Sequence, residues 1–288
     1  MKLTIYQVDA FTSHLFGGNP ATVIPLRQWI SDELMQQLAM ENNQSETVFY
    51  VPSVKEGVDF DIRWFTPVCE INLCGHATLA AAFVHFIQPE NASGKIVFHS
   101  QSGLLTVTKN EDWIELDFPS WNPRPVQDHP EVLRNILGVE KIVSVHRYRD
   151  WLVELESEEV VAACRPDFSL MKAHTDKLII TAAGREVDFV SRFFAPGVGI
   201  DEDPVTGSAH SQLIPYWHGK TGKTDMLARQ LSARGGYLKC RQVNEERVVM
   251  SGQAVLYMTG EINCPAEYPC RAILPGNYYR HVPAYFRL

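Results

Sequence analysis

Arg63-Trp64-Phe65-Thr66-Pro67, followed by Gly75-His76-Ala77-Thr78-Leu79, is the stretch that decides the fold, because the chain contains a second version of it. The second version is Arg192-Phe193-Phe194-Ala195-Pro196, followed by Gly207-Ser208-Ala209-His210-Ser211. Each version has an aromatic segment typical of a strand, a proline that ends it, a polar loop, and a glycine that opens a helix-like run of small residues. The repetition predicts two related halves.

The glycines Gly75 and Gly207 mark the expected starts of two helices. The first N–H groups of a helix have no partner within the helix, so they favour an anion. A glycine also lets a ligand approach the backbone closely. Two such helix starts facing one cleft would suit a small acidic molecule. Gly75, Gly207 and Ser208 are therefore predicted to bind a carboxylate-bearing substrate.

The composition is that of a globular protein with a negative surface. The 288 residues are 45% hydrophobic and carry a formal net charge of −8. This length is enough for two domains with separate cores. No two Lys or Arg residues are adjacent, so no nucleic-acid partner is expected.

The N-terminus and the cysteines bear on the compartment. Residues 1–9 alternate like a strand and lack the apolar region of a signal peptide, which favours a cytoplasmic location. The longest nearly apolar run, residues 77–86, is too short to span a bilayer, so no membrane partner is expected. Six cysteines without CxxC spacing predict reduced thiols. Neither a structural zinc site nor any other metal site is predicted.

The coarse pattern is one of many strands with one prominent helix in each half. Strands are predicted at residues 2–8, 21–26, 46–51, 58–65, 95–100, 103–108, 113–118, 142–147, 151–155, 177–182, 187–194, 227–232, 237–241, 246–250 and 253–259. The segment from Gly75 to Ile87 is apolar on nearly every side, so it should run as a helix through the middle of a curled sheet. Pro215 is predicted to kink or shorten the second helix.

Prolines mark the predicted division of the chain. Residues 119–125 contain three prolines, which disfavour both a helix and a central strand. We therefore expect an N-terminal domain at 1–119 and a C-terminal domain at 120–262. Residues 263–288 lack clear periodicity and form a tail to which the sequence assigns no role.

Six motifs, in order along residues 3–260, resemble the phenazine-biosynthesis F (PhzF-like) family. They are Asp9-Ala10-Phe11-Thr12, Phe16-Gly17-Gly18-Asn19-Pro20, Ser45-Glu46-Thr47, Arg63-Trp64-Phe65-Thr66-Pro67, Cys74-Gly75-His76-Ala77-Thr78 and Glu202-Asp203-Pro204-Val205-Thr206-Gly207-Ser208-Ala209. The resemblance implies an α+β protein of the diaminopimelate-epimerase fold: two similar domains, each a curled sheet around a central helix, with the active site between them. It also implies proton-transfer isomerisation without a cofactor, and a homodimer.

Three residues are predicted to be catalytic. Glu46 begins a strand between a polar turn and an apolar stretch, and the resemblance makes it the acid and base that moves the proton. His76 lies in the first turn of a helix, whose positive end would favour the neutral ring, so it is expected to donate a hydrogen bond or relay a proton. Asp203, in the loop before the second helix, would orient groups across the cleft. Ser45, beside Glu46, is predicted to bind substrate.

Cys74 separates two mechanisms. Amino-acid racemases that the fold resembles place one thiol before each central helix, but residues 196–212 contain no cysteine. A two-thiol mechanism is therefore not supported, and Cys74 is expected to be a small buried packing residue. The hypothesis is a cofactor-independent isomerase. Two alternatives stay open: an epimerase that uses Cys74 with Glu46 or Asp203 as unlike bases, and a noncatalytic protein that binds a small acid or a protein partner.

Overall fold

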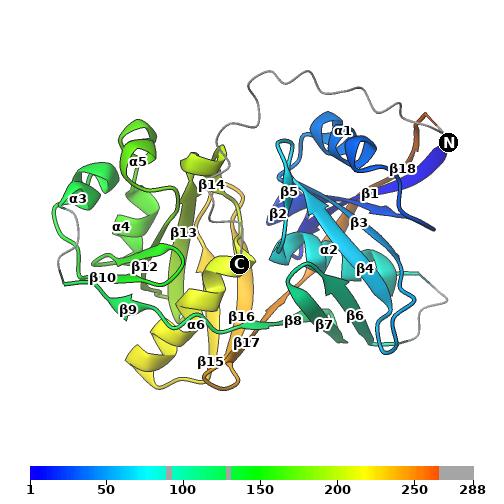
Figure 1. The fold of residues 1–288 in the computed structure, drawn as a ribbon. Helices are drawn as coiled ribbons and strands as arrows, with labels where there is room; N and C mark the ends of the chain where they lie inside the picture. Colours follow the sequence, from blue (N-terminus) through cyan, green and yellow to red (C-terminus); the bar gives the residue numbers. More distant parts are fainter. Residues whose placement is uncertain (89–92, 128–130, 266–288) are drawn as a thin grey trace.

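The computed structural model describes residues 1–88, 93–127 and 131–265 (Figure 1). The first half contains β1 (Lys2–Ala10), β2 (Asn19–Pro25), α1 (Asp32–Asn42), β3 (Glu46–Pro52), β4 (Phe60–Phe65), β5 (Glu70–Ile71), α2 (Gly75–Phe86), β6 (Lys95–Ser100), β7 (Gly103–Asn110) and β8 (Trp113–Pro119). The second half begins with β9 (Arg124–Pro125), α3 (Val132–Leu137), β10 (Ser144–Arg147), β11 (Trp151–Glu154), α4 (Glu158–Ala163), α5 (Phe168–His174), β12 (Leu178–Ala183) and β13 (Phe189–Ala195). It continues through η1 (Pro196–Val198), β14 (Ile200–Asp203), α6 (Gly207–Thr221), β15 (Asp225–Gln230), β16 (Gly236–Gln242), β17 (Arg247–Gly252) and β18 (Ala254–Asn263).

The two halves repeat one pattern of strand pairing. In the first half β2 and β3 are parallel, β3 and β4 antiparallel, β4 and β6 parallel, and β6 to β8 antiparallel. In the second half β11 and β12, β12 and β13, β13 and β15, and β15 to β17 follow the same sequence of directions. The predicted duplication and the α+β class are both confirmed.

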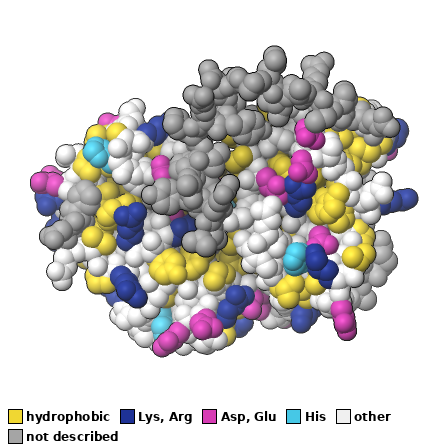
Figure 2. Space-filling model, viewed as in Figure 1, with side chains coloured by type: hydrophobic (Ala, Val, Ile, Leu, Met, Phe, Trp, Pro, Cys, Tyr) yellow, Lys and Arg dark blue, Asp and Glu magenta, His cyan; other side chains and the backbone are white. Residues whose placement is uncertain are grey.

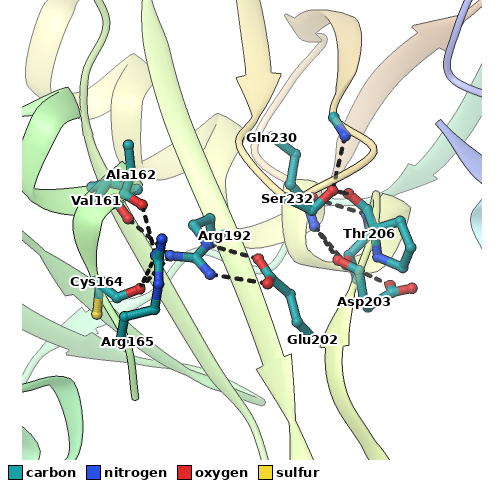
Figure 3. A network of polar contacts seen from close by, with 12 residues as sticks. Val161, Ala162, Cys164, Arg165, Arg192, Glu202, Asp203, Thr206, Gln230 and Ser232 are labelled. Carbon is teal, nitrogen blue, oxygen red and sulfur yellow. Dashed lines mark hydrogen bonds and ion pairs between the residues drawn. The ribbon is translucent and has the colours of Figure 1, made fainter. Parts of the chain in front are cut away.

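A matched ion pair fixes the register of the duplication. Arg63 Nε and Nη2 donate to both carboxylate oxygens of Glu70, each at 2.7 Å. Arg192 Nε and Nη2 donate in the same way to Glu202, at 2.7 and 2.9 Å. In each half the residue two positions after the arginine lies opposite the glutamate on the neighbouring strand: Phe65 opposite Glu70, and Phe194 opposite Glu202. Figure 3 shows the second pair.

The halves are joined by a symmetric exchange of strands (Figure 1). Strands β8 and β17 pair with each other antiparallel, from Ile114 opposite Gly252 to Pro119 opposite Arg247. After β8 the chain crosses into the second half, where β9 pairs with β10. After β17 it returns to the first half, where β18 pairs with β1. The predicted C-terminal domain, 120–262, therefore includes a strand that belongs to the sheet of the first half.

Both central helices, α2 and α6, are largely buried. The sequence predicted this for α2. All but two of the 12 residues of α2 are buried. Alanines 77, 80, 81 and 82 are fully buried in the main apolar cluster, and α2 packs against strands that include β1, β2, β3 and β8. One apolar cluster includes buried residues of α2 and of α6, such as Leu79, Leu213 and Trp217. The two halves therefore share a core at the place where they meet.

Pro215 was predicted to kink or shorten α6, and the helix is not shortened. The helix runs for 15 residues from Gly207 to Thr221 with the proline inside it. A proline in a helix leaves the carbonyl four residues earlier without its N–H donor. That carbonyl belongs to Ser211, and it accepts instead from the backbone N–H of Trp121 at 2.8 Å. The helix thus keeps its length, and the freed carbonyl binds the crossing segment between the halves.

Several short elements were not predicted. They are β5, β9, β14, α3, α4 and α5, all of 2 to 7 residues, too short to show a periodicity. Of the predicted tail, residues 266–288 lie outside the described residues, while Cys264 bonds through its backbone to Met1. Among the described helices, none is both long and apolar enough to cross a membrane. Figure 2 shows basic and acidic side chains interspersed over the described part of one face.

Candidate active site

The N-termini of α2 and α6 meet. A Cβ atom built on Gly75 would lie 3.1 Å from Cα of Gly207, and a Cβ on Gly207 would lie 3.1 Å from Cα of Gly75. The two helix starts therefore converge, as the duplicated sequence predicted. Their free N–H groups and the positive ends of both helix dipoles come together at one place.

The side chains of Glu46 and His76 lie beside this meeting point. Glu46 is the first residue of β3 and His76 the second residue of α2, and both are buried. Oε2 of Glu46 lies 2.9 Å from Nε2 of His76. The alignment does not make a hydrogen bond, so each of these two atoms is buried without a hydrogen-bond partner in the described structure. Buried polar atoms without partners indicate a bound ligand that supplies the missing hydrogen bonds.

The charge state of His76 differs from the sequence expectation. Burial lowers the pKa of His76, but its neighbours Cys74 and Glu46 raise the pKa well above its ordinary value. Of these two neighbours, Glu46 is the one that is charged at neutral pH. The expectation of a neutral ring considered only the helix dipole, which acts on every residue of the first turn. The carboxylate at 2.9 Å is closer and carries a full charge, so it outweighs the dipole.

Asp203 reaches the same site from the second half, through Asn19. The Asn19 Nδ2 amide donates to Asp203 Oδ1 at 2.7 Å and to the Val205 carbonyl at 2.9 Å, and it lies 3.1 Å from Nδ1 of His76. The other oxygen of Asp203 accepts from the Thr206 hydroxyl at 2.5 Å. Burial raises the pKa of Asp203 to about 6, although the charge of His76 opposes the change. Figure 3 shows Asp203 with Thr206 and Gln230.

Cys74 takes part in the site more closely than the sequence predicted. It precedes Gly75 and is buried, as expected for a packing residue. Its Sγ, however, lies 3.5 Å from Nδ1 of His76. Burial, followed by the charge of Glu46, raises the pKa of Cys74 to about 11. At neutral pH the group is therefore a thiol, neither a strong nucleophile nor a ready base.

Glu46, Cys74 and His76 together offer one carboxylate oxygen, one sulfur and one nitrogen within 4.8 Å of one another. These are atom types that zinc accepts. The imidazole, however, stands between the other two groups: Nδ1 faces the sulfur and Nε2 faces the carboxylate. An ion bound by all three would have to replace these contacts and ionise a thiol whose pKa is raised to about 11. The arrangement fits proton transfer better than metal binding.

The remaining predicted residues lie around these groups. Ser45 donates from Oγ to Oδ1 of Asn19 at 3.3 Å, and it is half-buried. Ser208, also half-buried, accepts through its Oγ from Nη2 of Arg149 at 3.1 Å. Asn19 was not predicted as a site residue. The sequence contained a signal for this residue, because Asn19 belongs to one of the six motifs and precedes a proline at the start of a strand.

Known proteins resemble this chain in both sequence and fold. A family model described as phenazine biosynthesis-like protein matches residues 8–260. A protein named as an uncharacterized isomerase of Pseudomonas aeruginosa is 49% identical over 263 residues, covering 91% of this chain and 99% of the relative. The crystal structure of a PhzF family phenazine biosynthesis protein from Enterococcus faecalis has 47% identity and a TM-score of 0.86, covering 92% of this chain and all 100% of that one.

A more distant structure extends the same fold. A predicted epimerase from Pseudomonas aeruginosa has 19% identity and a TM-score of 0.71, with 91% of this chain and 100% of that chain covered. The expected epimerase-like architecture of two curled sheets around central helices is thus confirmed. The chain belongs to the phenazine biosynthesis-like (PhzF) family.

Proposed function

We propose that this protein is a cofactor-independent isomerase that moves a proton between two carbons of a small carboxylate-bearing substrate. Glu46 is the group that takes the proton and returns it. His76 and Asp203 assist, and the helix starts at Gly75 and Gly207, with Ser45 and Ser208, hold the substrate. The names of the relatives support the isomerase class.

The single observation that carries this proposal is that the Glu46 carboxylate and the His76 imidazole, at the helix starts, each have a buried polar atom without a hydrogen-bond partner. Glu46 Oε2 and His76 Nε2 are buried, 2.9 Å apart, and neither has a hydrogen-bond partner among the described residues. A carboxylate held in this way has an oxygen that can accept a proton from carbon. The adjacent imidazolium offers a proton to negative charge that develops on the substrate.

The proposed reaction conserves atoms and electrons. The Glu46 carboxylate removes a proton, so that a C–H bond breaks and an O–H bond forms, and the released electron pair shifts along the substrate's unsaturated system. The neutral Glu46 no longer stabilises the imidazolium, so His76 becomes a better hydrogen-bond donor to the substrate. Glu46 then returns the proton to a different carbon, and the enzyme is restored without any oxidant or reductant.

The alternatives receive less support from the site. An epimerase with Cys74 as one of two bases would need a thiolate, and burial raises the pKa of Cys74 to about 11. A noncatalytic binding protein would not need a buried carboxylate paired with a histidine, which costs desolvation energy. We also propose a homodimer, as the family resemblance leads us to expect, and a cytoplasmic location, where free cysteines stay reduced.

Deuterium exchange tests the proposed role of Glu46. Cyclic unsaturated carboxylic acids are incubated in D₂O with the wild type, Glu46→Gln or Glu41→Gln, and the products are followed by NMR. Glu46→Gln keeps the size of the side chain but cannot ionise, so turnover should fall by at least about a hundredfold. Glu41→Gln changes an exposed acid on α1 and should match the wild type.

The position of the label adds a second criterion. A single carboxyl group that carries the proton should retain part of the label when a deuterated substrate reacts in ordinary water. A shifted double bond identifies an isomerase, whereas loss of a stereocentre without a shift identifies an epimerase. Equal rates for the wild type and Glu46→Gln would show that Glu46 is not the base.

A further inference from the structure

The duplication assigns a partner position to Glu46. Thr47 pairs with Phe65 in the first half, and Leu178 pairs with Phe194 in the second. Because Phe65 and Phe194 each follow the matched arginine by two residues, Thr47 corresponds to Leu178 and Glu46 corresponds to Lys177. Glu46 lies beside the first turn of α2, so Lys177 occupies the related place beside the first turn of α6. One half thus has an acidic side chain, Glu46, where the other half has a basic side chain, Lys177.

A second cation is fixed at the same helix start. Nη2 of Arg149 donates to Oγ of Ser208 at 3.1 Å, and Ser208 is the residue of α6 that corresponds to His76 in α2. The guanidinium lies 4.4 Å from the ring centroid of Trp121 and pairs with Asp150. The backbone N–H of Arg149 donates at 2.9 Å to Oε1 of Gln212, which is fully buried. Arg149 is therefore positioned by several groups, while 35% of its side chain stays exposed.

The two cations act on each other. Burial lowers the pKa of Lys177, and the positive charge of Arg149 lowers it further, while the charges of Asp150 and Asp176 oppose the change without cancelling it. Two cations at one helix start, where the dipole is also positive, are each destabilised by the others. A bound anion relieves that repulsion and gains hydrogen bonds from charged donors, which are about twice as strong as neutral ones.

We propose that Lys177 and Arg149 form, with Ser208, the subsite that binds the substrate's carboxylate group. This inference rests on the proposed function and specifies it: the substrate places its anionic end at the second half and its transferable proton at Glu46. The opposite charges of the two related positions orient the substrate in one direction across the helix starts. A substrate without the carboxylate lacks this anchor and binds weakly.

A titration with benzoate and benzamide tests the subsite. Benzoate is an anionic ring and benzamide is its uncharged analogue, and binding is followed by NMR. Lys177→Met and Arg149→Met should each weaken benzoate binding by about tenfold or more and leave benzamide binding unchanged. Lys172→Met is the control, because Lys172 is an exposed lysine of the same half, 54% exposed at its side chain, and should bind benzoate normally.

A conservative series separates charge from folding. Lys177→Arg keeps the cation and should bind benzoate within a few-fold of the wild type, whereas Lys177→Gln should not. Melting temperatures are measured for all variants, and the Arg and Gln variants decide the matter if a Met variant does not fold. No saturable benzoate binding by the wild type, or unchanged binding by the Met and Gln variants, would overturn the inference.

The inference and the proposed function fail in different ways. Normal benzoate binding by Lys177→Met and Arg149→Met, together with loss of exchange in Glu46→Gln, overturns the subsite alone. Weak benzoate binding by those variants, together with normal exchange in Glu46→Gln, overturns the catalytic role of Glu46 and leaves an anion site. The two experiments use the full chain and the same preparations.

Discussion

Gly75 and Gly207 are in direct backbone contact, each at the first residue of a central helix. A Cβ on either one would come within 3.1 Å of the other's Cα, closer than side chains normally pack. The contact brings together two helix starts that lie 132 positions apart in sequence, by subtraction of 75 from 207. Each half alone therefore presents an incomplete site.

Gly207→Ala should separate the two helix starts. The added methyl group would also meet Met250 Sδ at 3.4 Å, so we expect a loss of about 1–3 kcal/mol in the free energy of unfolding. Gly219→Ala is the control: it lies in the same helix with nothing within 4 Å, and it should stabilise the protein slightly. Urea denaturation of both variants checks this. Equal stability of the two would show that the helix starts are not tightly packed.

Arg192→Met should destabilise the protein more than Arg63→Met. The Arg192 side chain is 7% exposed, and it donates to Glu202 and to the carbonyls of Val161 and Cys164. Removing it leaves buried acceptors without a donor, at a cost of about 3–5 kcal/mol. The Arg63 side chain is 21% exposed, so water can replace its lost bonds. Unfolding free energies that rank the two in reverse would contradict this reasoning.

The repeated motif was sufficient to predict the two halves, because strand, proline and helix-starting glycine are local signals. It also predicted the convergence of Gly75 and Gly207. The exchange of β9 and β18 was not predicted, since strand pairing depends on where the chain crosses between halves. The continuation of α6 past Pro215 was not predicted either. The carbonyl freed by Pro215 finds its donor in Trp121, which is distant in sequence.

The site residues were found by residue type and motif, but their charge states were not. The helix dipole alone predicted a neutral His76. The contact with Glu46 that raises its pKa joins a strand to a helix 30 residues later, by subtraction of 46 from 76, and no spacing rule describes it. Asn19 was overlooked because an asparagine before a proline is also an ordinary turn signal. The correspondence between Glu46 and Lys177 in the two halves could be drawn only from the observed register of four strands.

Asp203 should make the protein less stable as the pH rises. Its pKa is raised from 3.8 in the unfolded chain to about 6 in the folded state. The protonated form therefore favours folding, and that contribution is fully present below about 3.8 and is lost as the pH rises through about 6. Asp203→Asn cannot ionise and keeps oxygen and nitrogen atoms for Asn19 and Thr206.

Unfolding in urea between pH 4 and pH 7.5 tests this expectation. The stability of Asp203→Asn relative to the wild type should increase by roughly 2–3 kcal/mol across the range. Asp201→Asn alters an exposed neighbour, 60% exposed at its side chain, and should follow the wild type at every pH. A difference between Asp203→Asn and the wild type that does not change with pH would mean that Asp203 ionises as freely in the folded protein as in the unfolded one.

Cys74 should resist alkylation while the site remains active. Burial and the charge of Glu46 raise its pKa to about 11, so little thiolate is present at pH 7.5. Among the cysteines of the described residues, iodoacetamide should modify the half-buried Cys69 first, and peptide mapping reads each cysteine separately. Cys74→Ala should keep exchange activity within about tenfold of the wild type, because its sulfur only contacts Nδ1 of His76. Rapid alkylation of Cys74 with parallel loss of exchange would instead favour the epimerase with unlike bases, in which this thiol carries the second proton.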